Sequence, residues 1–189
     1  QKGKFLLIMN IFISGGCKNG KSHHAQELVR CMAEEKSLPM YYIATMISTG
    51  PEDDLRIKRH IRDREGWGFI TLEQPRNLCD LLDRGDVNLK GVFLMDSITA
   101  LLQNEMFGID GSYNERAGHK VAQNLQDFAN ATGNTVFVSD YIYSDARAYD
   151  EWTENYRRSL AYCDRETAKA CDRVIETCFG TFRELKTVK

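Results

Sequence analysis

The chain has 189 residues, enough to bury one substantial core, and 42% of them are hydrophobic and 28% charged, as in ordinary globular proteins. Its formal net charge of −2 supplies no global field that would draw it to nucleic acid or to a membrane surface. The sequence contains no run of about 18 apolar residues, so we expect no transmembrane helix.

Six cysteines are scattered along the chain without the paired spacing of a zinc site or of a disulfide framework. We therefore expect reduced thiols and a cytoplasmic protein. The basic and apolar opening is loosely like a signal peptide, but Gly15 and Gly16 follow at once and no small-residue cleavage site precedes them. We expect one domain over residues 1–189, with residues 1–8 as an extension outside its core.

The first predicted strand, residues 9–14, leads through a glycine-rich loop into a predicted helix at residues 23–36. The loop fits the phosphate-binding pattern G-x-x-x-x-G-K-[ST] at every fixed position. Its backbone N–H groups and the N-terminus of the following helix can bind phosphate oxygens. Lys21 can contact the β- and γ-phosphates, and the Ser22 hydroxyl can coordinate Mg²⁺. We predict that a nucleoside triphosphate is bound by Gly15, Gly16, Cys17, Lys18, Asn19, Gly20, Lys21 and Ser22, with Lys21 also catalytic.

After a second predicted strand at residues 40–45, a charged helix is predicted at residues 53–64, where five basic residues surround His60. Helical spacing places Arg56, His60 and Arg64 along one side, while Ile57 and Ile61 turn to another. Nearby cations disfavour the charged imidazolium and can stabilise charge during attack at phosphorus. His60 is therefore a candidate nucleophile, with a solvated charged helix face as the alternative.

Strands are predicted next at residues 69–73 and 92–95, and the second is followed by Asp96. P-loop enzymes use an acid at such a strand end to hold the Mg²⁺ shell, so we predict Asp96 and Ser22 as the Mg²⁺ side of the site. An aspartate that caps the following segment is the alternative. No residue stands out as the base for phosphoryl transfer.

The remaining predicted helices are at residues 114–131, capped by Asn114 and stopped by Gly133, and at residues 154–171. Strands are predicted at residues 135–138 and 174–179. This alternation predicts an α/β P-loop fold with a mostly parallel sheet and helices on both faces.

Several short motifs follow the phosphate loop in a characteristic order. They are Tyr42-Ile43-Ala44-Thr45, Arg56-Ile57…His60…Arg64, Thr71…Glu73…Pro75, and Asp96 with Ile98-Thr99 and Asn104. Weaker matches to the same pattern continue to Ala168…Asp172…Val174 and Gly180. From Met9 onward the chain resembles the bifunctional adenosylcobinamide kinase / adenosylcobinamide-phosphate guanylyltransferase family of cobalamin biosynthesis.

The resemblance implies phosphorylation of the hydroxyl on the aminopropanol arm of adenosylcobinamide, followed by GMP transfer from GTP to that phosphate. It further implies GTP or ATP and Mg²⁺ as ligands, a guanylylated histidine at His60, a RecA-like fold and a homo-oligomer, a trimer in the family. The implied guanine-nucleotide contacts are Ala44, Thr45, Met46, Ile61, Arg62, Asp63, Arg64, Glu73 and Asp96.

The C-terminal half departs from the family pattern. Asp140-Tyr141-Ile142-Tyr143 replaces Asn-Glu-Val-Gly, and Ala161-Tyr162…Asp164-Arg165 replaces Gly-Arg…Asn-Gln. Two other readings therefore stay open: a different small-molecule P-loop kinase or a member with one half-reaction, and a nucleotide-binding sensor without catalysis.

Overall fold

The computed structural model describes residues 9–187, so the predicted extension at residues 1–8 lies outside the described residues. Within that range one seven-stranded sheet has the order β3-β2-β4-β5-β1-β6-β7. Neighbouring strands pair in parallel except β6 and β7, which are antiparallel, so the predicted mostly parallel sheet is confirmed. The strands are β1 Ile11–Gly15, β2 Met40–Ala44, β3 Ile70–Glu73, β4 Val92–Asp96, β5 Thr135–Asp140, β6 Arg173–Cys178 and β7 Thr181–Thr187.

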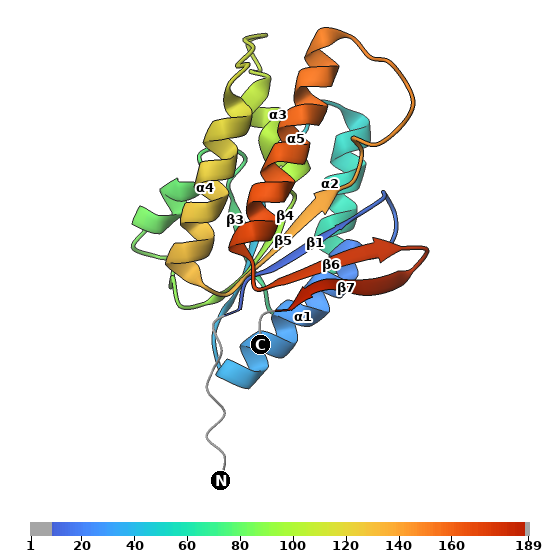
Figure 1. Ribbon diagram of the computed structural model, residues 1–189. Coiled ribbons are helices and arrows are strands. Elements are labelled where there is room, and N and C mark those ends of the chain that lie inside the picture. The colour runs from blue at the N-terminus through green and yellow to red at the C-terminus, as the bar shows by residue number, and fades with distance from the viewer. Residues whose placement is uncertain (1–8, 188–189) are drawn as a thin grey trace.

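Helices cover both faces of the sheet, as predicted. The helical elements are α1 Lys21–Lys36, α2 Pro51–Asp63, the 3-10 helix η1 Leu78–Asp83, α3 Ile98–Met106, α4 Ala117–Thr132 and α5 Glu151–Ala170. Helix α1 lies against one face, and α3, α4 and α5 lie together against the other (Figure 1). In β1 the alternation of side chains explains this, since Ile11 and Ile13 pack toward α1 while Phe12 packs toward the other layer.

The strands alternate with helices because parallel neighbours need a crossover, and burial on both faces gives them continuous apolar sequences. Helix α1 buries Ala25, Val29 and Ala33, a stripe with a spacing of four residues. On the other face, the rings of Phe93 and Phe128 meet edge to face with their centroids 5.3 Å apart. These contacts fix the helices over the sheet and leave the carboxyl ends of the parallel strands at one edge.

Three elements, η1, α3 and β7, were not predicted. Helix α4 begins at Ala117 rather than at residue 114, because the Asn114 side chain accepts the Arg116 N–H in a turn before the helix. Its predicted stop at Gly133 is confirmed, with φ at 66° in the left-handed region. None of the helices within residues 9–187 has the length and apolar character needed to cross a membrane.

Candidate functional site

The phosphate loop connects β1 to α1 at the carboxyl edge of the sheet. Gly15 lies so close to β6 that a Cβ on it would sit 2.3 Å from the Thr177 carbonyl oxygen, which only glycine avoids. Gly20 has φ at 82°, in the left-handed region, and turns the chain directly into α1. The free N–H groups of the first turn of α1 therefore stand at the loop, where anions are favoured.

Lys21 is the best-defined cation of the loop, and its side chain is 6% exposed. Its Nζ donates to the Gly16 carbonyl oxygen at 2.6 Å and lies 2.9 Å from the Asp140 Oδ1. Asp140 ends β5, in register with Gly15 on the adjacent β1. The ammonium is thus held at the start of the loop by two oxygens that phosphate oxygens could replace.

Asp140 was not predicted to belong to the site. A signal was available, because the sequence of β5 ends in an acid just as that of β4 does. The sequence alone does not say which of the two acids lies beside the phosphate loop. The strand order decides this, because β5 lies between β1 and β4 and its terminal acid is therefore next to the loop.

Asp96, the predicted Mg²⁺ ligand, ends β4. Its Oδ2 accepts a hydrogen bond from the Tyr42 hydroxyl at 3.1 Å. Burial, and next the negative charge of Asp96, raise the pKa of Tyr42 well above its usual value, so the hydroxyl stays protonated and donates. The Arg64 guanidinium stands 4.2 Å from the centroid of the Tyr42 ring, which places a permanent cation near the carboxylate.

A cavity of about 360 Å³ lies beyond the carboxyl ends of β3, β2 and β4. Parallel pairing brings these ends together, with Ala44 in register with both Glu73 and Asp96. The cavity is lined by His60 and by seven of the implied nucleotide contacts, namely Ala44, Thr45, Met46, Ile61, Arg64, Glu73 and Asp96. Arg62 instead lines an adjoining hollow, and Asp63 lines neither.

Helix α2 forms one wall of this cavity without entering the core, since none of its residues is buried. The prediction that Ile57 and Ile61 turn away from His60 is wrong, because both line the cavity with it. Residues 57, 60, 61 and 64 follow the i, i+3, i+4, i+7 spacing of a single helix face. Arg56 lies off that face and approaches Asp53 at 4.0 Å.

Two motif residues hold the strand ends in place. The buried Thr45 hydroxyl accepts the Ser97 N–H at 2.8 Å and donates to the Ser97 carbonyl oxygen at 3.0 Å, joining the ends of β2 and β4. The Asn104 amide donates to the carbonyl oxygens of Thr45, at 2.7 Å, and Pro75, at 3.0 Å. One side chain of α3 therefore ties the segments after β2 and β3 together.

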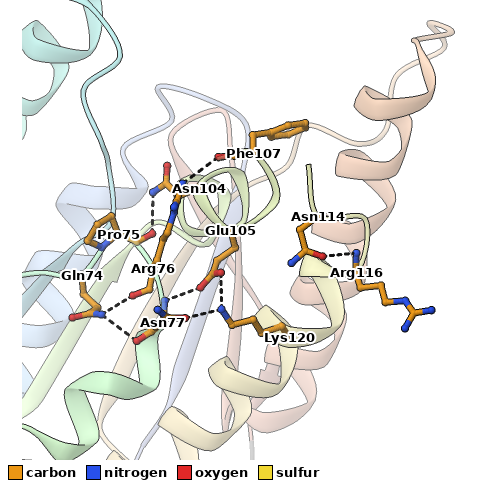
Figure 2. Close-up of polar contacts among 10 residues, drawn as sticks. All are labelled: Gln74, Pro75, Arg76, Asn77, Asn104, Glu105, Phe107, Asn114, Arg116 and Lys120. Carbon is orange, nitrogen blue, oxygen red and sulfur yellow. Dashed lines mark hydrogen bonds and ion pairs between the residues drawn. The ribbon is translucent and has the colours of Figure 1, made fainter. Parts of the chain in front are cut away.

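The segment after β3 is also clipped to α3 and α4, as Figure 2 shows. Glu105 accepts the Asn77 N–H at 2.7 Å, and Lys120 donates to both Glu105 and the Asn77 side chain. The Arg76 guanidinium donates to the Phe107 carbonyl oxygen at 3.3 Å. These contacts fix the exit of β3, and with it the position of Glu73.

The residues present fit a Mg²⁺ ion that is completed by phosphate oxygens. Mg²⁺ is usually held by one or two carboxylates plus substrate phosphates. Ser22 is the second residue of α1, directly after Lys21, and the half-buried Asp96 uses only its Oδ2 for Tyr42. Among the residues that the structure describes, no three His, Cys, Asp or Glu side chains form a group that could hold a metal alone.

Comparison with known families gives a match over residues 11–185 to the family described as cobinamide kinase / cobinamide phosphate guanyltransferase. The chain belongs to this family. The resemblance found in the motifs is thereby confirmed. The match includes the C-terminal half, where the sequence departs from the family pattern.

Two curated relatives are named bifunctional adenosylcobalamin biosynthesis protein CobU. The protein from Escherichia coli (strain K12) is 33% identical over 104 residues, which cover 54% of this chain and 53% of the relative. The protein from Salmonella typhimurium (strain LT2) is 31% identical over 103 residues, with the same coverage. The chain thus spans about half the length of the curated relatives it matches.

Among solved structures, the flagellar accessory protein FlaH from Methanocaldococcus jannaschii is similar over 96% of this chain and 79% of its own. Its sequence identity is 14% and its TM-score 0.49.

Proposed function

We propose that this protein phosphorylates the aminopropanol hydroxyl of adenosylcobinamide and then transfers GMP from GTP to the resulting phosphate. One observation carries the proposal: in a member of this family, His60 and seven implied guanine-nucleotide contacts line one cavity. The phosphate loop lies at the same carboxyl edge of the sheet, which supports the use of nucleoside triphosphates.

In the kinase step, the acceptor hydroxyl oxygen attacks the terminal phosphorus of ATP or GTP. The bond from that phosphorus to the bridging oxygen breaks, the nucleoside diphosphate leaves with the electron pair, and the hydroxyl proton passes to solvent. The loop amides hold the phosphates, and Lys21 exchanges Asp140 for a terminal phosphate oxygen as charge develops there.

In the transfer step, an imidazole nitrogen of His60 attacks the α-phosphorus of GTP, and pyrophosphate leaves. The phosphoramidate N–P bond then breaks when an oxygen of the corrinoid phosphate attacks, which returns the free imidazole. Arg64, held by Tyr42 and Thr71, is placed to stabilise charge on the phosphate, and Asp96 and Glu73 provide acceptors for nucleotide donors.

Ser22 and Asp96 would hold Mg²⁺, which supplies charge neutralisation for the phosphates when bound. The proposal includes a homo-oligomer, as the family resemblance implies, and a cytoplasmic location. All six cysteines are unpaired, which is consistent with a reducing compartment.

The test is covalent labelling. The protein is incubated with α-labelled GTP and Mg²⁺ and then denatured. We expect the parent to carry a label that is acid-labile and alkali-stable. His119→Ala, which replaces an exposed histidine on α4, is the control and should carry the same label. No label is expected on His60→Ala, which should still release nucleoside diphosphate in the presence of cobinamide.

The departures in residues 140–165 favour a second candidate, a P-loop kinase that lacks the transfer step. Cobinamide-dependent release of nucleoside diphosphate without any covalent label would support that candidate and remove the guanylyltransferase half. Turnover that is indifferent to cobinamide would remove both.

A further inference from the structure

A second and larger cavity, of about 540 Å³, opens at the other side of the phosphate loop. It lies between α5 and the part of the sheet formed by β1 and β6, which run side by side below α5 in Figure 1. Apolar side chains dominate its lining, with Phe12 and Val174 from the strands and Ala168 from the helix. A space of this size and character suits an organic ligand rather than a few waters.

The floor of this cavity carries a buried carboxyl that is only partly satisfied. Asp164 is 3% exposed and its Oδ2 accepts the Tyr143 hydroxyl at 3.1 Å. Its Oδ1 makes no hydrogen bond of ordinary length in the described part of the chain, although the Ser139 hydroxyl is near enough to lower the pKa of the carboxyl. The hydroxyl of Ser14, which lines the same cavity, is also buried without a partner. Buried polar atoms are nearly always paired, so these two indicate a ligand with complementary polar groups.

The mouth of the cavity coincides with the start of the phosphate loop. Gly15, Gly16 and Asn19 line it, together with Tyr141, the residue after Asp140. Lys21 donates to Gly16 and pairs with Asp140, and in such loops the lysine contacts the β- and γ-phosphates. A molecule in this cavity would therefore present its outer end to the terminal phosphate.

We propose that this cavity is the phosphoryl-acceptor pocket, which receives the hydroxyl-bearing aminopropanol arm of the corrinoid with Asp164 Oδ1 accepting the arm's N–H. The inference rests on the proposed function and adds a subsite to it. Asp164 is a specificity-determining residue in this assignment, since a buried acceptor left unpaired penalises ligands that lack the donor.

The lining also coincides with the positions where the chain departs from the family pattern. Tyr141, Tyr143, Asp164 and Arg165 all line this cavity. Four of the departing residues thus lie on one surface beside the loop, whereas most of the motif residues that match the family line the His60 cavity. If the cavity binds the phosphoryl acceptor, its lining can differ from the family pattern while the residues that contact the nucleotide stay the same.

The experiment measures kinase kinetics for Asp164→Asn and for Ala168→Phe, which fills the cavity from the position one helical turn after Asp164 on α5. Exposed residues of α4 provide matched controls, Asp127→Asn and Ala131→Phe. We expect the KM for cobinamide to rise about tenfold in Asp164→Asn, because a charged acceptor is replaced by a neutral one. Phosphorylation of cobinamide should fall more steeply in Ala168→Phe.

The KM for the nucleotide and the rate of His60 labelling by α-labelled GTP should stay at parental values in both variants, and that labelling also reports that they are folded. An unchanged KM for cobinamide in both variants overturns the assignment, as does a rise in the nucleotide KM alone, which would make the cavity a nucleotide subsite. A parent protein that binds nucleotide but never phosphorylates cobinamide overturns the proposed function instead, and the pocket assignment with it.

Discussion

Lys21 and Asp140 form an ion pair of 2.9 Å that joins the first turn of α1 to the end of β5 at the start of the phosphate loop. The lysine is almost fully buried and the aspartate partly exposed, so the pair is only partly screened by solvent. Asp140 therefore neutralises the cation of the phosphate loop in the nucleotide-free protein, and a bound phosphate would compete with it for Lys21.

Asp140→Asn should destabilise the nucleotide-free protein by about 1–3 kcal/mol, because it leaves the buried ammonium with one neutral acceptor. Saturating Mg²⁺ and nucleotide should reduce this deficit, since a phosphate oxygen then takes the place of the carboxylate. Urea unfolding with and without nucleotide measures both values, with Asp127→Asn as the surface control. An equal deficit in the two conditions would contradict the exchange.

Arg64→Lys should raise the KM for GTP in the labelling reaction about tenfold. Lysine keeps the charge but loses the planar group that stacks on Tyr42 and reaches Thr71 at 3.4 Å. Arg30→Lys is the matched control, because Arg30 stands over Trp67 at 5.0 Å without lining the His60 cavity. Equal KM values for the two variants would show that stacking of Arg64 is irrelevant to nucleotide binding.

Asn104→Ala should cost about 1–3 kcal/mol of stability, since two carbonyl oxygens lose their shared donor. It should also raise the KM for GTP, because Thr45 and Pro75, which follow β2 and β3, lose their link and Glu73 at the end of β3 is held less firmly. Gln123→Ala, which removes an exposed hydrogen bond on α4, should change neither quantity. Denaturant unfolding and GTP labelling kinetics together check this prediction.

Asp164 should make the protein less stable as the pH rises toward 7. Burial raises the pKa of its carboxyl from 3.8 to about 7, with a smaller contribution from Asp140, while Ser139 and Tyr143 oppose the rise. The folded state therefore binds the proton more tightly than the unfolded state, and the stabilisation present below about pH 4 is lost as the pH passes through about 7. Charged or titratable neighbours on its own helix are Tyr156, Cys163 and Arg165.

Between pH 4 and pH 8 the free energy of unfolding of the parent should fall by on the order of 4 kcal/mol more than that of Asp164→Asn. Carboxylates that are not coupled to Asp164 titrate alike in both proteins, so the difference reports this group together with its coupling to Asp140. Under the acceptor-pocket assignment, the KM for cobinamide of the parent should also decrease as the pH rises through 7, and that of Asp164→Asn should not. Parallel stability profiles would show that Asp164 does not carry the raised pKa.

The elements with strong local signals were predictable from sequence. The phosphate loop is marked by its glycines, and α1 is marked by apolar residues at helical spacing. The strands that lead to Gly15 and Asp96 are marked by short apolar runs. Helix α3 was missed because it has only nine residues and a short apolar run indicates a strand as readily as a helix. Strand β7 was missed because nearly all of its side chains are exposed, while the turn at Phe179 and Gly180 lacks a standard hairpin sequence.

The site was predictable where family motifs identify residues and not where it depends on strand order. His60 and Asp96 come together because β2, β3 and β4 end at one edge, which no local pattern specifies. The pairing of Lys21 with Asp140 requires β5 to lie beside β1. The error about Ile57 and Ile61 has a similar cause. Helical spacing gives the directions of the side chains relative to one another, but it does not say which face of α2 packs against the sheet.

The two cavities are on opposite faces of the sheet: Phe12 and Ser14 border one on the α5 side, whereas Tyr42 and Asp96 border the other on the α1 side. Under the proposed function, the sheet separates the place where one chain would form the corrinoid phosphate from the place where it would accept GMP. The phosphorylated arm would then have to leave the first cavity and pass the carboxyl ends of the strands before its phosphate could reach His60 of the same chain.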